Sequence, residues 1–209
     1  MKKEHLCEIV NYMESFAKDS AHDKEHIYRV LNHALILARN YDVNMDILVA
    51  ACLLHDIGRP AQFADPKQCH ANVGSNMAYD FLKKLGWSEN DCLHTKHCVL
   101  CHRFSNSEQP ETTEAKILFD ADKLDVIGAL GIARTLQYEG KMNASLNEFL
   151  NEYNRKLVKL YDVFFTKEAK QIASNEKMLL ESFYQGLIAQ LDTSEADAYL
   201  MRQIDTNCI

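Results

Sequence analysis

The apolar residues of this chain recur mostly three and four positions apart, which is the spacing of an amphipathic helix. No segment sustains the alternation of apolar and polar residues that is typical of a half-buried strand. The second expected helix shows the helical stripe well, with Ile27, Val30, Leu31, Ala34, Leu35 and Ala38. The pattern therefore predicts an all-α fold.

Short polar residues ahead of the apolar stripes predict where the helices begin. Ser20 with Asp23, and Ser88 with Asp91, have the spacing of a capping box, and Asn44 suits the N-cap of the third helix. We expect helices over residues 3–18, 20–40, 44–57, 70–85, 88–102 and 114–137, and one or two long amphipathic helices over 146–191.

Glycines predict several of the helix ends. Gly58 suits the left-handed position that follows the third helix, Gly86 ends the fourth, and Gly140 breaks the sixth. The two remaining polar stretches, 59–69 and 103–113, are predicted to be loops.

No internal repeat or low-complexity tract divides the chain, so we expect a single domain over residues 1–209. Its core would cover about 19–137, with the C-terminal helices of about 146–191 packed on it. The apolar residues of those last helices are predicted to be core, with a dimer face as the alternative, so monomer and homodimer both stay open. They are Leu146, Phe149, Tyr153, Leu157, Leu160 and Phe164.

Composition narrows the possible partners. A net charge of -7 and a pI of about 5.7 argue against a basic face for a nucleic-acid polymer, whereas a small phosphorylated molecule needs only a few local cations. The N-terminus lacks the apolar core of a signal peptide, and no apolar run is long enough to span a membrane. The seven cysteines are then expected to be reduced thiols, which predicts a cytoplasmic protein.

Ionisable residues stand where the apolar pattern predicts a core. The run from Ile47 to Leu54 is apolar throughout, and His55 and Asp56 follow it directly. Such groups are costly to bury unless they are hydrogen-bonded, paired or bound to a metal. With His26 and Asp122 they would offer imidazole nitrogens and carboxylate oxygens, a donor set that suits Mn, Fe, Co, Ni or Zn, with Mg also possible.

Three motifs carry a resemblance to a known family: His26-x2-Arg29-Val30, Leu53-Leu54-His55-Asp56-Ile57-Gly58 and Asp120-Ala121-Asp122-Lys123-Leu124-Asp125. They resemble the HD-domain metal-dependent phosphohydrolase superfamily. Further matches to a compact bacterial subgroup extend the likeness over roughly residues 19–186. They are His70-x3-Gly74, His102-Arg103-Phe104-Ser105, Gly128–Arg134 and Thr166-x2-Ala169-Lys170.

The resemblance implies a helical bundle in which His26, His55, Asp56 and Asp122 bind a divalent metal. Some members of the family hold a second metal, for which His70, His97 and His102 are the candidates here. We favour one tight metal, with His70 and His102 shaping a phosphate pocket, over a second and weaker metal.

Residues among and beside the expected ligands are assigned roles in catalysis, namely Asp56, Asp122 and Lys123. Asp56 and Asp122 are the expected catalytic carboxylates, with Asp122 helping to orient the attacking water. Arg59 and Lys123 would hold the substrate phosphate, or else form ordinary salt bridges. Asp125 could orient a ligand histidine or Lys123.

The resulting interpretation is an enzyme, a metal-dependent hydrolase of a small phosphorylated substrate, with a nucleotide favoured and ester or anhydride cleavage left open. Two alternatives remain: a regulatory HD domain that senses a nucleotide, and a di-iron HD-type oxygenase. The sequence Cys98-Val99-Leu100-Cys101-His102 matches a haem-attachment pattern, but no export signal supports that reading. A zinc site built from His94, His97 and the nearby cysteines lacks a second ligand-bearing element.

Overall fold

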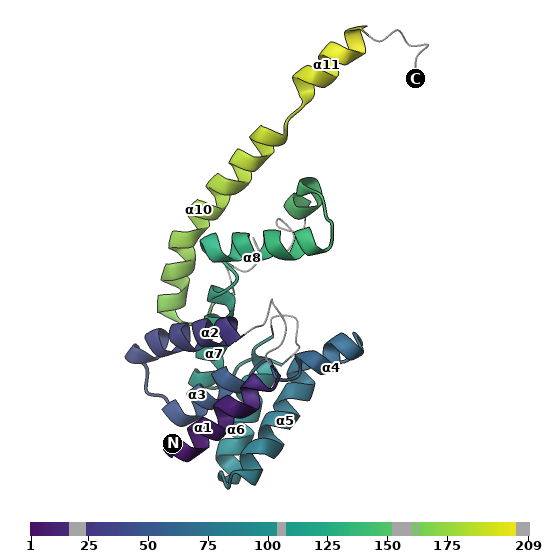
Figure 1. Ribbon diagram of the computed structural model, residues 1–209. Helices are drawn as coiled ribbons and strands as arrows, with labels where there is room; N and C mark the ends of the chain where they lie inside the picture. Colours follow the sequence, from purple (N-terminus) through teal and green to yellow (C-terminus); the bar gives the residue numbers. More distant parts are fainter. Residues whose placement is uncertain (17–23, 104–107, 152–160, 162, 204–209) are drawn as a thin grey trace.

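The computed structural model describes residues 1–16, 24–103, 108–151, 161 and 163–203. All regular structure in these residues is helical, so the all-α prediction is confirmed (Figure 1). The helices are α1 (Lys3–Glu14), α2 (Lys24–Leu37), the short 3-10 helix η1 (Ala38–Asn40), α3 (Met45–Leu54), α4 (Arg59–Ala64), α5 (His70–Lys84), α6 (Glu89–Cys101), α7 (Thr113–Leu124), α8 (Gly128–Lys141), α10 (Lys167–Leu191) and α11 (Ser194–Gln203).

The helix α3 lies at the centre of the core, as its apolar sequence predicts. It contacts α1, α2, α6 and α7, so neighbours cover several sides of it. Its N-cap is Asn44, whose side chain accepts hydrogen bonds from the backbone N–H groups of Asp46 and Ile47. Seven of its ten residues are buried: Ile47, Leu48, Ala50, Ala51, Cys52, Leu53 and Leu54.

Of the two other predicted helix starts, the structure confirms one and does not describe the other. Ser88 caps α6 by accepting from the N–H of Asp91 at 3.1 Å, which confirms this helix start, and its hydroxyl donates to the Asp91 carboxylate at 2.8 Å. The box at Ser20 lies outside the described residues. Gly86 ends α5 with φ of +80°, a conformation that glycine adopts without steric cost.

The prediction for Gly58 is wrong, and so is the loop that was expected after it. Gly58 has φ of -81° rather than a left-handed conformation, and it immediately precedes α4. Glycine is required there for space: a Cβ atom would lie 2.1 Å from the carbonyl oxygen of His70 and 2.7 Å from the nitrogen of Gly74. The turn that carries His55 and Asp56 therefore packs backbone to backbone on α5.

The single helix expected over 114–137 is also wrong, because the chain forms two helices, α7 and α8. The break follows Asp125, and α8 begins at Gly128 with φ of +63°. Gly140, expected to break the helix, lies within α8. Asp125 is bound by side chains from α2 and α8, a tertiary contact that hydrophobic periodicity does not reveal.

The C-terminal helices extend away from the rest of the molecule (Figure 1). The first part of α10 contacts α7 and α8 and buries Ala169 and Ala173, whereas α11 buries no residue. No helix among the described residues is both long and apolar enough to cross a membrane. Of the predicted C-terminal core residues, Phe149 and Phe164 are buried and Leu146 is exposed; Tyr153, Leu157 and Leu160 lie outside the described residues.

Candidate metal centre

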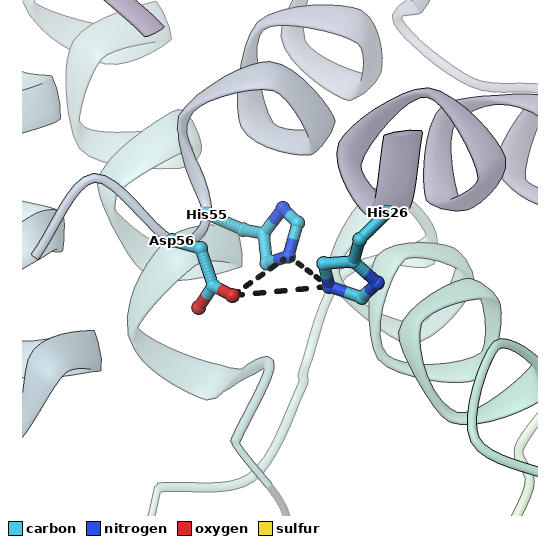
Figure 2. A group of neighbouring side chains, drawn as sticks. All are labelled: His26, His55 and Asp56. Carbon is cyan, nitrogen blue, oxygen red and sulfur yellow. Dashed lines mark hydrogen bonds and ion pairs between the residues drawn. The ribbon is translucent and has the colours of Figure 1, made fainter. Parts of the chain in front are cut away.

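Three helices bring His26, His55, Asp56 and Asp122 to one point. His26 lies in the first turn of α2, His55 and Asp56 in the turn after α3, and Asp122 near the end of α7. The Nε2 atoms of His26 and His55 are 3.3 Å apart, and Asp56 Oδ2 lies 3.8 and 3.6 Å from them (Figure 2). Asp122 Oδ1 lies 3.5 Å from Nε2 of His26. The four side chains predicted as ligands thus converge.

The outer nitrogens of the two imidazoles are already hydrogen-bonded. Nδ1 of His55 donates to the carbonyl oxygen of Cys52 at 2.7 Å, and Nδ1 of His26 donates to Oδ2 of Asp125 at 2.7 Å. In a neutral ring the inner Nε2 then carries a lone pair and no proton. Two such lone pairs at 3.3 Å repel each other, and a cation between them removes that repulsion.

Burial and size both favour a divalent ion at this point. Burial lowers the pKa of His55 to about 4, so its ring is neutral near pH 7. Ligands about 2.1 Å from a tetrahedral ion lie about 3.4 Å from one another, close to the separations seen here. Burial alone would raise the pKa of Asp122, but the ammonium of Lys123 and three neighbouring histidines together hold that pKa well below its ordinary value.

A second cluster lies on the other oxygen of Asp56. Oδ1 of Asp56 is 3.5 Å from Nε2 of His70 and 3.6 Å from Nε2 of His102, and the two nitrogens are 3.2 Å apart. Nδ1 of His102 donates to the carbonyl oxygen of Val99, and Nδ1 of His70 faces the side-chain oxygen of Gln62. The inner nitrogens are therefore again lone-pair donors. Burial, with His102 nearby, lowers the pKa of His70 to about 2.

These are the two groups of buried histidine and aspartate among the described residues that are spaced to hold a metal ion, and Asp56 belongs to both. His97, a candidate for a second metal, is in neither. Its Nε2 accepts a hydrogen bond from the N–H of Glu111, and its Nδ1 lies 3.5 Å from Sγ of Cys101. His94 lies 3.1 Å from a carboxylate oxygen of Glu114. Neither of the two groups that are spaced to hold a metal ion in the described residues includes a residue from the cysteine-rich face of α6.

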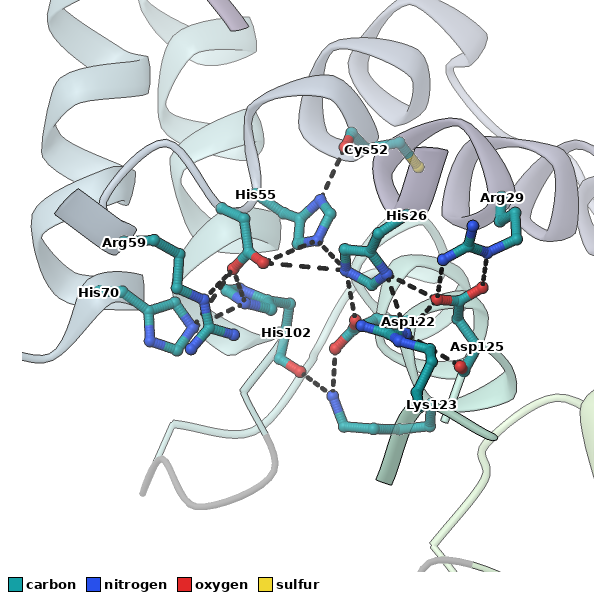
Figure 3. A network of polar contacts seen from close by, with 12 residues as sticks. His26, Arg29, Cys52, His55, Arg59, His70, His102, Asp122, Lys123 and Asp125 are labelled. Atoms are coloured by element: carbon teal, nitrogen blue, oxygen red, sulfur yellow. Dashed lines mark hydrogen bonds and ion pairs between the residues drawn. The ribbon is translucent and has the colours of Figure 1, made fainter. Parts of the chain in front are cut away.

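The cations expected to hold phosphate are bound to protein groups in this structure. Nε of Arg59 donates to Oδ1 of Asp56 at 2.9 Å. Nζ of Lys123 donates to the carbonyl oxygen of His102 and to Oδ2 of Asp122, each at 2.6 Å (Figure 3). Lys123 is also buried. Their role in binding phosphate stays a prediction.

Asp125 holds the outer nitrogen of His26 and so positions one ring of the first cluster. Its carboxylate is fully buried and accepts from Nδ1 of His26, from Nε of Arg29 at 2.6 Å and from Arg134 (Figure 3). Such an outer carboxylate fixes the tautomer and the orientation of a ligand histidine. The sequence spacing suggested this contact for Asp125.

Asp120 was missed as a functional candidate. It is fully buried, and its oxygens accept from the N–H groups of Phe165 and Thr166 and from the Thr166 hydroxyl. Residues two apart on a helix point to roughly opposite sides, so Asp120 and Asp122 could not share one site. The two-residue spacing of Asp120 and Asp122 was thus the sequence signal that Asp120 acts away from the metal centre.

Comparisons with known proteins agree with this arrangement. Residues 24–127 match the family model of the HD domain. An HD-superfamily hydrolase from Bacillus thuringiensis is 29% identical, with 92% of this chain and 100% of that one covered and a TM-score of 0.71. A predicted HD superfamily hydrolase from an uncultured Thermotogales bacterium is 28% identical, with 90% and 94% covered and a TM-score of 0.67.

The uncharacterized protein YpgQ of Bacillus subtilis is 25% identical over 200 residues, which cover 91% of this chain and 95% of YpgQ. The crystal structure of YpgQ in complex with ADP has a TM-score of 0.73 at 24% identity, with 91% and 96% covered. The buried clusters are consistent with a metal site typical of HD domains. From the matched segment, the fold and these neighbours together, the chain belongs to the HD domain superfamily.

Proposed function

We propose that this protein is a metal-dependent hydrolase of a small phosphorylated substrate, with a nucleotide as the substrate class. The observation that carries the proposal is the inward convergence of the Nε2 lone pairs of His26 and His55 beside Asp56. With Asp122 these side chains would hold one divalent ion, of Mn, Fe, Co, Ni, Zn or Mg. The donor set fits such an ion without any sulfur ligand.

A bound divalent ion would supply Lewis acidity, which acidifies a ligated water and polarises a phosphoryl oxygen. The protein's own residues would position the attacking water and neutralise negative charge on the substrate. Asp56 and Asp122 would orient the attacking water by accepting hydrogen bonds from it. Arg59 and Lys123 would offset the negative charge of the phosphoryl oxygens, which requires each to exchange a present carboxylate contact for the substrate.

To the single ion favoured from the sequence, the proposal adds a second ion at the cluster of His70, His102 and Asp56, which was the alternative there. Its support is the symmetry of the two groups, since Asp56 offers one oxygen to each of them. Elemental analysis of protein purified without chelator measures the number of ions. Two ions per chain are expected in the wild type and one in the His102→Ala variant. One ion in both proteins would contradict the second ion and favour a role of His102 in the phosphate pocket.

A nucleotide is favoured over other phosphate compounds because YpgQ was crystallised with ADP. The net charge of -7 also favours a small substrate over a polyanion, because a negative protein repels a polyanion. Cleavage of an ester and of an anhydride both remain open.

Phosphate release from a panel of nucleotides, with each candidate metal in turn, tests the proposed function. We expect turnover by the wild type and a loss of at least a thousandfold in Asp56→Ala, which removes a ligand from both clusters. Asp80→Ala, at an exposed position of α5, is the matched control and should retain full activity.

The same experiment separates the alternatives. Nucleotide binding without turnover under every metal would contradict the enzyme and support a regulatory sensor. Bound iron with oxygen consumption would instead support the oxygenase.

A further inference from the structure

A cavity of about 250 Å³ lies beside the candidate metal centre and takes no part in metal binding. Its apolar walls are Phe119 on α7, Pro110 ahead of α7, and Val163 and Phe165 in the segment ahead of α10. Arg103, Glu108 and Gln109 supply polar groups to its lining. The cavity thus combines flat aromatic surface with hydrogen-bonding groups, and its volume is below that of pockets for drug-sized ligands.

Buried hydrogen bonds hold the aromatic wall in place. The rings of Phe119 and Phe165 meet edge to face, with centroids 5.1 Å apart. The N–H of Phe165 donates to Oδ1 of Asp120 at 2.9 Å, and both the N–H and the hydroxyl of Thr166 donate to Oδ2. Because Asp120 is fully buried, Phe165 is fixed to α7 before any ligand arrives.

The cavity is linked to the metal centre by short contacts. Nζ of Lys123 lies 4.6 Å from the centre of the Phe119 ring and 2.6 Å from Oδ2 of Asp122. Arg103 directly follows His102, whose carbonyl oxygen also binds Lys123. Phe119 and Arg103 of the cavity lining are thus each one contact or one residue from the groups that bind Lys123, the partner of Asp122.

We infer that this cavity binds the base of a nucleotide substrate whose phosphate reaches the metal centre. The inference rests on the proposed function and adds the base subsite to it. An aromatic wall provides stacking for any planar base, while Gln109, Glu108 and Arg103 provide donors and acceptors for its edge. A phosphorylated sugar without a base would leave this wall uncovered.

The Phe165→Leu variant tests the base subsite, since leucine keeps apolar volume but cannot stack as a flat ring. Calorimetric titration with ADP measures affinity without turnover, and we expect a loss of about tenfold. In activity assays, the preference for a nucleotide over the matching base-free ribose phosphate should fall by a similar factor. Phe165→Tyr keeps the ring and should restore both values.

The control is Phe183→Leu, which removes a half-buried ring on α10, where it meets Phe149 rather than the cavity. It should bind ADP as the wild type does. Equal ADP affinity in the wild type and Phe165→Leu, or an equal loss with the base-free compound, would overturn the base subsite. If the wild type binds ADP in this way but hydrolyses no phosphate compound, the proposed function fails while the subsite stands.

Discussion

Asp125 determines how His26 presents its inner nitrogen to the candidate metal. The carboxylate has no solvent exposure, and it joins His26 to the guanidinium groups of Arg29 and Arg134. A carboxylate at this place keeps the proton on Nδ1 of His26, so that Nε2 remains a lone-pair donor. We therefore expect the affinity for metal to depend on Asp125, a residue outside the proposed ligands.

Replacing Asp125 with Asn should weaken metal binding by about 10- to 100-fold, because the amide no longer fixes the tautomer of His26. Titration of the chelated protein with a divalent metal measures this change, and circular dichroism establishes that the variant folds. Asp80→Asn, on the exposed face of α5, is the control. Unchanged affinity in a folded Asp125→Asn protein would contradict the positioning role.

Gly58 acts by occupying almost no space. A side chain there would collide with the backbone of α5 at His70 and Gly74, not with flexible side-chain ends. Gly58→Ala should therefore lower the free energy of unfolding by about 1–3 kcal/mol or more, and displace His70 from its cluster. Urea denaturation measures the loss.

The matched control for Gly58 is Gly186 in α10, where an added Cβ meets nothing within 4 Å. Gly186→Ala should stabilise the protein by up to about 1 kcal/mol, since alanine favours a helix more than glycine does. A similar effect of both substitutions would mean that helix propensity, and not the close approach at Gly58, controls stability.

At the scale of elements, α7 serves two sides of the molecule. Asp122 and Lys123 face the metal centre, whereas Asp120 binds the segment that leads into α10. The helix ends directly after them, because Asp125 is held by α2 and α8. This termination explains why one predicted helix became two.

Asp120→Asn should lower the free energy of unfolding by about 2–3 kcal/mol. The amide has one acceptor oxygen, while three donors from Phe165 and Thr166 now share two carboxylate oxygens. Urea denaturation measures this, with the exposed Asp197→Asn in α11 as a control expected to change little. A loss below about 0.5 kcal/mol would show that α10 is held mainly by apolar contacts.

On the scale of the whole molecule, the candidate metal centre joins α2, the turn after α3 and α7, and the second cluster adds α5 and α6. An ion that binds only the folded state stabilises it by about 2.7 kcal/mol at a hundredfold excess over its Kd. Removing metal with a chelator should therefore lower the Tm by about 5–10 °C, as measured by scanning calorimetry. His55→Ala should already have a lower Tm and should respond less to chelator than the wild type, because only the second cluster can then hold an ion.

The sequence by itself determined the helical class, the buried α3 and the identity of the residues that converge at the centre. Helical periodicity and the cost of burying charge are local properties, and family motifs record which polar residues belong together. The tertiary structure decided what depends on contacts between distant segments. It set the close packing of Gly58 on α5, the end of α7 at Asp125, the sharing of Asp56 between two clusters, and the fixing of Phe165 by Asp120. None of these contacts lies within the reach of a helix period, because each joins residues that only the folded chain brings together.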